Sequence, residues 1–203
     1  MGMAGDVWAV NNSAASANYF RVAATHTGAA LTLLKNDFTL AGAPNGAGYR
    51  VTLTSVGDLT GVTYTIVGAV VGQQNGTTTV AIAGGSTATV TTTQYWSRID
   101  SITPSGTSAA STMAVGYAIN FALPRCRIKS VHFVGAAAAG TIVFNMNSTS
   151  GTPILTVDTQ ASATTSATSV LIPGEGILVG RSAANDFAIC TATQVTKFTV
   201  FCG

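Results

Sequence analysis

The sequence predicts an all-β protein built from two β-sandwich or jelly-roll-like modules with an extended N-terminal arm. Polar and apolar residues alternate in many short segments, and clusters of Gly, Pro and Ser separate these segments. Many short strands joined by turns are typical of sandwiches and jelly rolls. Helix signals are nearly absent, because the alanine-rich stretches 108–114 and 135–140 are short and lie close to glycine.

The chain is expected to divide into three parts. Residues 1–27 are rich in Ala, Asn and Ser and predict an arm that becomes ordered by lying on another surface; a short strand at 19–23 within it and a loosely packed terminus are the alternatives. Residues 28–122 are expected to form the first sandwich module. Leu123-Pro124 marks the boundary, since proline interrupts a strand-like run, and residues 123–203 form the second module.

Alternation predicts strands throughout both modules, with Thr suited to half-exposed strand positions because its side chain is β-branched. In the first module the predicted strands are 50–54, 62–66, 79–83, 88–92 and 113–121. In the second module they are 128–134, 141–146, 154–157, 169–172, 176–179, 187–190 and 196–201. Loops are expected at 42–48, 84–86 and 103–106.

An uncharged run of 39 residues, 59–97, lies between Asp58 and Arg98. About 20 consecutive apolar residues would be enough to cross a bilayer, but the polar segment 72–79 interrupts this run. Its alternation instead predicts strands with Thr on one face and apolar side chains on the other.

Charged residues make up only 8% of the chain, against about 25% in an ordinary soluble domain. Such a composition predicts that much of the surface is covered by copies of the chain or by partners; a surface made soluble by hydroxyls and amides is the alternative. The net charge is +2, and the only basic cluster is Arg125, Arg127 and Lys129. One cluster is typical of a solvated strand face, so neither a nucleic acid nor a membrane is expected as a partner.

The three cysteines, Cys126, Cys190 and Cys202, are widely spaced and form no C-x-x-C pair. No histidine lies near them at ligand spacing, so no metal site is expected. If 187–190 and 196–202 formed a hairpin, Cys190 would face Phe198 rather than Cys202. We therefore expect free thiols in a reducing compartment, in agreement with a start of the chain that shows no signal peptide.

The titratable residues offer little for catalysis. His26 and His132 are the only histidines, and His132 is typical of a strand residue bonded to a neighbour. Glu175 is the only glutamate and is expected in a turn, whereas a glycosidase needs two facing carboxylates. The 42–48 loop lacks the Lys-Ser/Thr ending of a phosphate-binding loop. We therefore expect no enzyme, no catalytic residues, no cofactor and no metal.

Three aromatic residues are candidates for a sugar-binding platform, on which a sugar ring would stack: Trp8, Tyr95 and Trp96. The alternative is core packing, because Tyr95-Trp96 is followed by Ile99 and Ile102.

Several segments resemble structural proteins of tailed-bacteriophage particles. In the first module these are residues 48–68, 93–102 and 105–117; in the second they are 126–131, 151–155, 172–179 and 199–203. Relatives often have Tyr near the end, where this chain has Cys202. The resemblance covers most of residues 40–203 and carries no catalytic residues.

The resemblance implies a virion component, assembled in the host cytoplasm, whose partners are copies of itself and the major capsid protein or other virion proteins. Within that class we expect a capsid decoration or cement protein, because sandwich modules in many copies can bury surface across capsomer junctions. A neck, adaptor or tail component is the alternative, and a receptor- or glycan-binding module is another. Residues 1–27 are expected to dock to the shell, so that their deletion would leave a folded domain that no longer joins particles.

Overall fold

The computed structural model describes residues 7–11, 15–39, 43, 46–73, 77–109, 111–161, 167–180 and 187–203. These residues form β-strands and connecting loops, without an α-helix among them. The strands pair antiparallel in two sheets, which confirms the prediction of an all-β, sandwich-like fold. The described part of the chain contains no helix of the length and hydropathy needed to cross a membrane.

The chain forms two compact units. The central unit is drawn from Ala14–Phe38 and Gly48–Ile119, and the C-terminal unit is drawn from Met1–Ser13, Thr39–Ala47 and Asn120–Gly203. The passage between them falls within strand β8 (Met113–Leu123), close to the expected boundary at 122/123.

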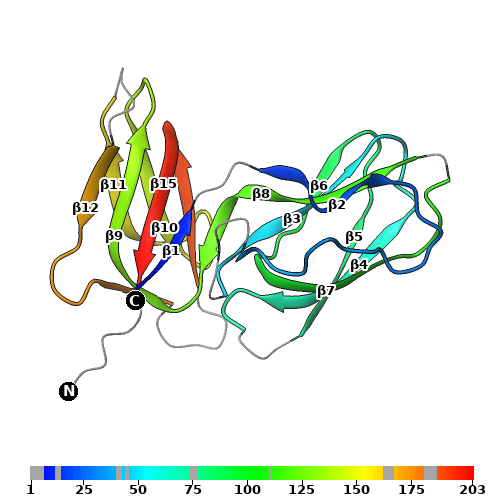
Figure 1. Ribbon diagram of the computed structural model, residues 1–203, viewed down its shortest axis with the longest axis horizontal. Coiled ribbons are helices and arrows are strands. Elements are labelled where there is room, and N and C mark those ends of the chain that lie inside the picture. Colours follow the sequence, from blue (N-terminus) through cyan, green and yellow to red (C-terminus); the bar gives the residue numbers. More distant parts are fainter. Residues whose placement is uncertain are drawn as a thin grey trace. The chain divides into compact units, whose positions relative to one another are not determined.

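In the central unit the strand order is β8-β3-β7-β4-β5, with β2 also paired to β8 and β6 to β3 (Figure 1). The strands other than β8 are β2 (Ser16–Ala24), β3 (Gly48–Ser55), β4 (Thr63–Val70), β5 (Thr78–Ala83), β6 (Thr89–Thr91) and β7 (Trp96–Pro104). Buried aromatic rings fill the core of this unit: Tyr19, Phe20, Phe38, Tyr49 and Tyr117 pack in mutual contact.

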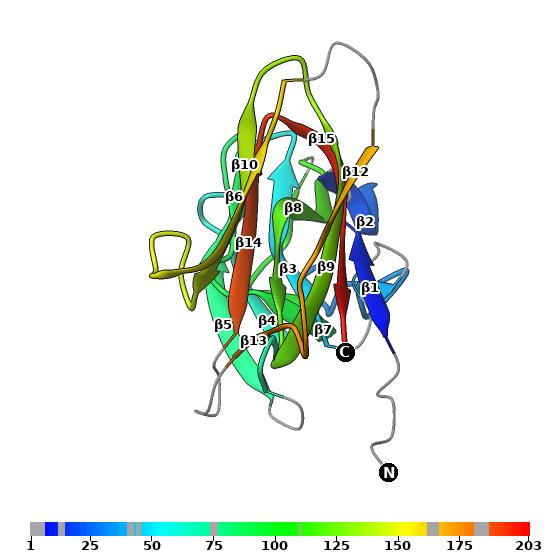
Figure 2. The same cartoon turned by 90° about the vertical axis from the view of Figure 1, so that its left-hand side faces the viewer.

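In the C-terminal unit one sheet has the order β1-β15-β9-β12, with β13 also paired to β9 (Figure 2). The other contains β11, β10 and β14, and β14 pairs with residues 121–123 at the end of β8. The strands are β1 (Trp8–Asn11), β9 (Cys126–Gly135), β10 (Gly140–Met146), β11 (Pro153–Thr159), β12 (Ala167–Leu171), β13 (Ile177–Val179), β14 (Ala188–Thr193) and β15 (Val195–Cys202).

The two sheets of the C-terminal unit meet through aromatic packing. Phe121 belongs to one sheet and Phe198 to the other, and their rings stack with centroids 5.5 Å apart at an interplanar angle of 28°. Both side chains are buried. This is the geometry of a sandwich core, in which the inner faces of two sheets interdigitate.

The predicted N-terminal arm is wrong for the residues that the structure describes. Trp8–Asn11 forms β1 and pairs with β15, and Ser16–Ala24 forms β2 and pairs with β8. Val10 and Phe20 are fully buried. The segment is therefore integral to both units, and its deletion would remove core side chains rather than detach a docking arm.

The last two strands do not form the hairpin that the sequence analysis considered for the cysteines. β14 pairs with β10 and β8, whereas β15 pairs with β9 and β1. Cys190 therefore lies opposite Phe144 on one side and Phe121 on the other, and Phe198 lies opposite Phe133. A tight turn at Gln194, whose φ is +52°, sends the chain to the other sheet instead of back along β14.

The uncharged run has the predicted division of faces in β4. Tyr64 and Ile66 are buried, whereas Thr63 is exposed and Thr65 is half-buried. Strand β7 was not predicted and extends into the expected loop at 103–106. In the loop expected at 42–48, residues 42, 44 and 45 lie outside the described residues; Ala43 and Ala47 are buried, and Gly48 already belongs to β3.

Candidate functional surface

His26 is held inside the central unit by three groups. Its Nε2 lies 2.8 Å from the Tyr64 hydroxyl, its backbone N–H donates to Oγ of Ser108 at 2.7 Å, and its carbonyl accepts from the Ser108 N–H at 3.0 Å. Burial lowers the pKa of His26, and the nearby Arg21 guanidinium lowers it further, while the backbone of Gly106 acts in the opposite direction. The imidazole is thus a neutral packing residue at pH 7.

His132 is a half-buried strand residue bonded to a neighbour, as predicted. Its Nδ1 is 2.8 Å from Oγ of Ser169 on the neighbouring strand β12. Within the described residues the imidazole has no hydrogen bond to a carboxylate that would orient it as a general base. A histidine and a serine in register across two strands therefore lack the third group of a triad.

Glu175 lies in the turn between β12 and β13, as predicted. Its carboxylate forms an ion pair with Arg127 at 3.2 Å, and its carbonyl accepts a hydrogen bond from Nζ of Lys129 at 2.6 Å. Gly174 and Gly176 flank it with φ values of +67° and +82°, which suit glycine. Arg127 and Lys129 on β9 therefore bind a turn of their own chain.

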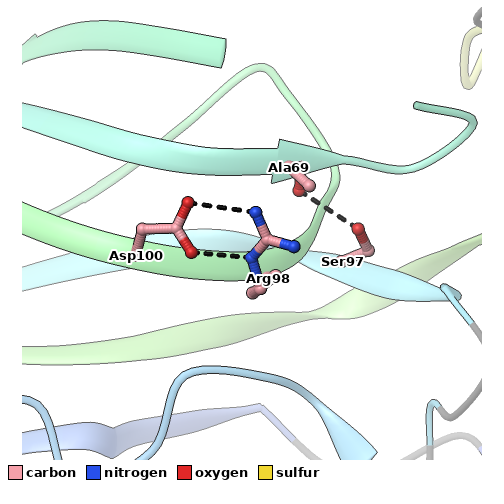
Figure 3. A network of polar contacts seen from close by, with 4 residues as sticks. All are labelled: Ala69, Ser97, Arg98 and Asp100. Carbon is pink, nitrogen blue, oxygen red and sulfur yellow. Dashed lines mark hydrogen bonds and ion pairs between the residues drawn. The ribbon is translucent and has the colours of Figure 1, made fainter. Parts of the chain in front are cut away.

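Arg98 and Asp100 form a second ion pair (Figure 3). The guanidinium donates to both carboxylate oxygens, from Nε at 2.6 Å and from NH2 at 3.1 Å. The two side chains share one face of β7, because they are two residues apart on a strand. Each charge is thereby matched within the unit.

The aromatic residues proposed for sugar stacking are mostly inaccessible. Trp96 is fully buried and Tyr95 is 5% exposed, so the faces of both rings are covered by protein. Nε1 of Trp96 donates to Oγ1 of Thr92 at 3.2 Å. Trp8 is half-buried on β1 of the C-terminal unit. The packing alternative holds for Tyr95 and Trp96.

The three cysteines are free and buried in the C-terminal unit, as the sequence predicted. Burial raises the pKa of the Cys190 thiol. A hydrogen bond with Cys126, together with burial, raises the pKa of the Cys202 thiol. Raised pKa values disfavour the reactive thiolate. Within the described residues, no group of three His, Cys, Asp or Glu side chains is arranged to hold a metal ion.

One pocket in the C-terminal unit has a volume of about 540 Å³. Its described lining is Met146, Thr152, Pro153, Ile154, Ile177 and Leu178. This lining has no ionisable side chain. The pocket therefore offers apolar contact and one hydroxyl, and no proton donor or acceptor near neutral pH.

The surface of the two units is poor in charge, since only 8% of the residues are charged. Large apolar side chains are exposed on both units: Val22, Leu34, Val56 and Ile119 on the central unit, and Val7 and Leu171 on the C-terminal unit. The terminal strands β5 and β12 contain no charged residue. Because uncharged surface loses little hydration free energy when covered, these regions are suited to contact with other proteins.

Comparison with known protein families, with curated proteins and with solved structures found no match for this chain.

Proposed function

We propose that this chain is a non-enzymatic structural protein of a tailed-bacteriophage virion, and that it decorates the capsid and cements neighbouring shell subunits. The observation that carries the proposal is the charge-poor surface of two folded β units, on which large apolar side chains are exposed. Two ion pairs, Arg98 with Asp100 and Arg127 with Glu175, match four of the charged side chains within the chain. A shell protein that covers these pairs therefore buries no unpaired charge there.

The burial of one histidine and of all three cysteine thiols supports a structural role. His26 is bonded to Tyr64 inside the core, and the three thiols are enclosed. Fold alone does not assign function. The particle assignment therefore rests on this surface chemistry together with the resemblance of residues 48–68 and 126–131 to phage structural proteins.

The contact surface belongs to the folded units and not to an N-terminal arm. Val22, on β2, is 58% exposed although its neighbour Phe20 is fully buried. Val56, beyond the end of β3, is 65% exposed. Such side chains gain burial only when another protein covers them, at about 25 cal/mol per Å² of apolar surface. We therefore assign shell contact to Val22 and Val56 on the folded central unit, and not to a separate N-terminal arm.

The test is the copy number of the chain in purified particles. A decoration protein occurs in numbers comparable to the major capsid protein, whereas a neck, adaptor or tail ring holds on the order of six to twelve copies. Quantitative mass spectrometry against an isotope-labelled standard separates these outcomes. Absence of the chain from purified particles would contradict the proposal.

Substitution of surface valines tests the contact itself. Val22→Glu and Val56→Glu place a charge where the proposal expects burial, so particles should lose the protein while its thermal unfolding is unchanged. Thr63→Glu adds the same charge at an exposed position of β4 and is the control for added charge. Full incorporation of both valine variants would argue against contact at these sites.

A further inference from the structure

The edge strand β5 has none of the features that usually keep a strand edge from pairing. It is the last strand in the order of the central unit, and its residues are Thr-Thr-Val-Ala-Ile-Ala. Edge strands are normally protected by charged side chains, proline, bulges or very short length. β5 has six residues without charge or proline, and it pairs with β4 without a register shift.

The register shows which backbone groups face outward. The Gly84 N–H donates to the Val62 carbonyl at 2.8 Å, so Gly84 and Val62 form a hydrogen-bonded pair just beyond the ladder. Hydrogen-bonded and non-bonded pairs alternate along antiparallel strands. Ile82 and Val80 therefore bond to β4, as partners of Tyr64 and Ile66.

The residues between them direct their N–H and C=O groups away from β4. These residues are Thr79, Ala81 and Ala83, and all three are exposed, whereas Val80 and Ile82 are half-buried. No hydrogen bond from the described part of the chain reaches these outward groups. Thr79, Ala81 and Ala83 thus each present a backbone N–H donor and a C=O acceptor that no described residue binds.

The other terminal strands differ in specific ways. β11 contains Pro153 and Asp158, and β1 has only four residues. β2 carries Arg21 and two register shifts. β12 is uncharged but shorter, and pairing with itself would set Thr168 opposite Val170.

β5 is complementary to a second copy of itself. In an antiparallel pair centred on Ala81, Ala81 lies opposite Ala81, and Thr79 lies opposite Ala83 of the second copy. These are the outward-facing positions, so the pair would form on the order of six main-chain hydrogen bonds. Val80 then lies opposite Ile82 of the second copy at non-bonded positions, where side chains approach most closely.

We propose that two copies of this chain associate antiparallel through β5, which continues the strand order of each central unit into that of the other. The occupant is a second copy because the register is self-complementary and the absence of charge removes like-charge repulsion. The half-buried Val80 and Ile82 gain apolar cover on the same face as Tyr64 and Ile66 of β4. This pairing deepens the proposed function and rests on it, because it names a second copy of the chain as one partner of the decoration protein.

The test is the mass of the purified full-length protein in solution, measured by sedimentation equilibrium across a range of concentrations. Ala81→Lys would set two charges opposite each other at the centre of the pair. Ala81→Pro removes an outward N–H and leaves the β4 ladder bonded. Like-charge contact costs several kcal/mol, so Ala81→Lys should raise the dissociation constant at least about tenfold.

The control is Thr156→Lys, which adds the same charge at an exposed position of another terminal strand, β11. Thr156→Lys should associate like the wild-type protein, and circular dichroism should show all variants folded. If Ala81→Pro fails to fold, the association of Ala81→Lys alone tests whether the copies pair through β5. Hydrogen exchange should also show amide protection at Thr79, Ala81 and Ala83 that increases with protein concentration in the wild type.

A wild-type protein that stays monomeric at all concentrations would overturn the inference, as would Ala81→Lys associating like the wild type. Both readouts use purified protein, so they are independent of whether the chain is found in particles. A monomeric protein present in particles would refute β5 pairing alone. A β5-paired protein absent from particles would refute the virion role alone.

Discussion

The Tyr64 hydroxyl lies 2.8 Å from Nε2 of His26 in the interior of the central unit. The two rings also meet edge to face, with centroids 5.5 Å apart at 82°. His26 follows β2 and Tyr64 lies in β4, so this contact joins the start of the central unit to its uncharged run.

This contact predicts a pH dependence of stability. The folded pKa of His26 lies below its ordinary value of 6.5, first because of burial and then because of Arg21. Between the folded pKa and 6.5 the unfolded state binds more protons, so the free energy of unfolding falls as the pH drops below about 6.5. Urea unfolding at several pH values from 5 to 8 should show this slope.

Two variants identify the group responsible for the slope. His26→Gln should flatten it, because the titrating group is removed while an amide can still bond to Tyr64. The control is His132→Gln, which makes the same substitution at a half-buried position of β9 in the C-terminal unit and leaves His26 and Tyr64 in place, so the slope should remain. An unchanged slope in His26→Gln would assign the pH dependence to another group.

The stacked pair Phe121 and Phe198 predicts a large loss of stability on truncation. Phe198→Ala should reduce the free energy of unfolding by about 3–5 kcal/mol, because it leaves a cavity between the two sheets. Phe201→Ala is the matched control on the same strand, where the side chain is only half-buried. Equal losses in both variants, measured by chemical denaturation, would mean that the core does not lie between β8 and β15.

The packing of β2 on β8 predicts a specific glycine requirement. A Cβ at Gly116 would collide with the Ser16 carbonyl oxygen, whereas a Cβ at Gly61 would meet no atom within 4 Å. Gly116→Ala should therefore lower stability by about 1–3 kcal/mol, and Gly61→Ala should have little effect. If the two variants unfold at the same temperature, β2 does not lie against β8.

The buried thiols predict slow chemical modification. In the native protein Cys126, Cys190 and Cys202 are 7%, 1% and 0% exposed, so an aromatic disulfide reagent should react with them only as fast as the protein opens. In denaturant all three should react at once. Rapid native reaction of any one would show that its thiol is accessible.

Strand segments in which buried and less buried residues alternate could be predicted from the sequence. Residues 130–135 of β9 and 63–67 of β4 alternate in this way, and the strands predicted at 128–134 and 62–66 overlap them. In β7 the buried residues are Trp96, Ile99, Ile102 and Pro104, so the spacing is three, three and two. Register shifts in the pairing with β4 cause this spacing, and a search for period two overlooks it.

The N-terminal segment escaped prediction for a related reason. In β2 the adjacent residues Tyr19 and Phe20 are both buried, because the pairing with β8 is interrupted by register shifts. Adjacent buried residues do not produce an amphipathic strand pattern. The candidate surface could not be predicted either, because the edge position of β5 depends on strand order and not on its own sequence.

Cryo-electron microscopy of purified phage particles is the decisive test of the decoration role. The reconstruction should show density for two β units on the outside of the capsid, at many symmetry-related positions, with Val22 and Val56 at contacts. Particles without this density on the capsid surface would contradict the decoration role.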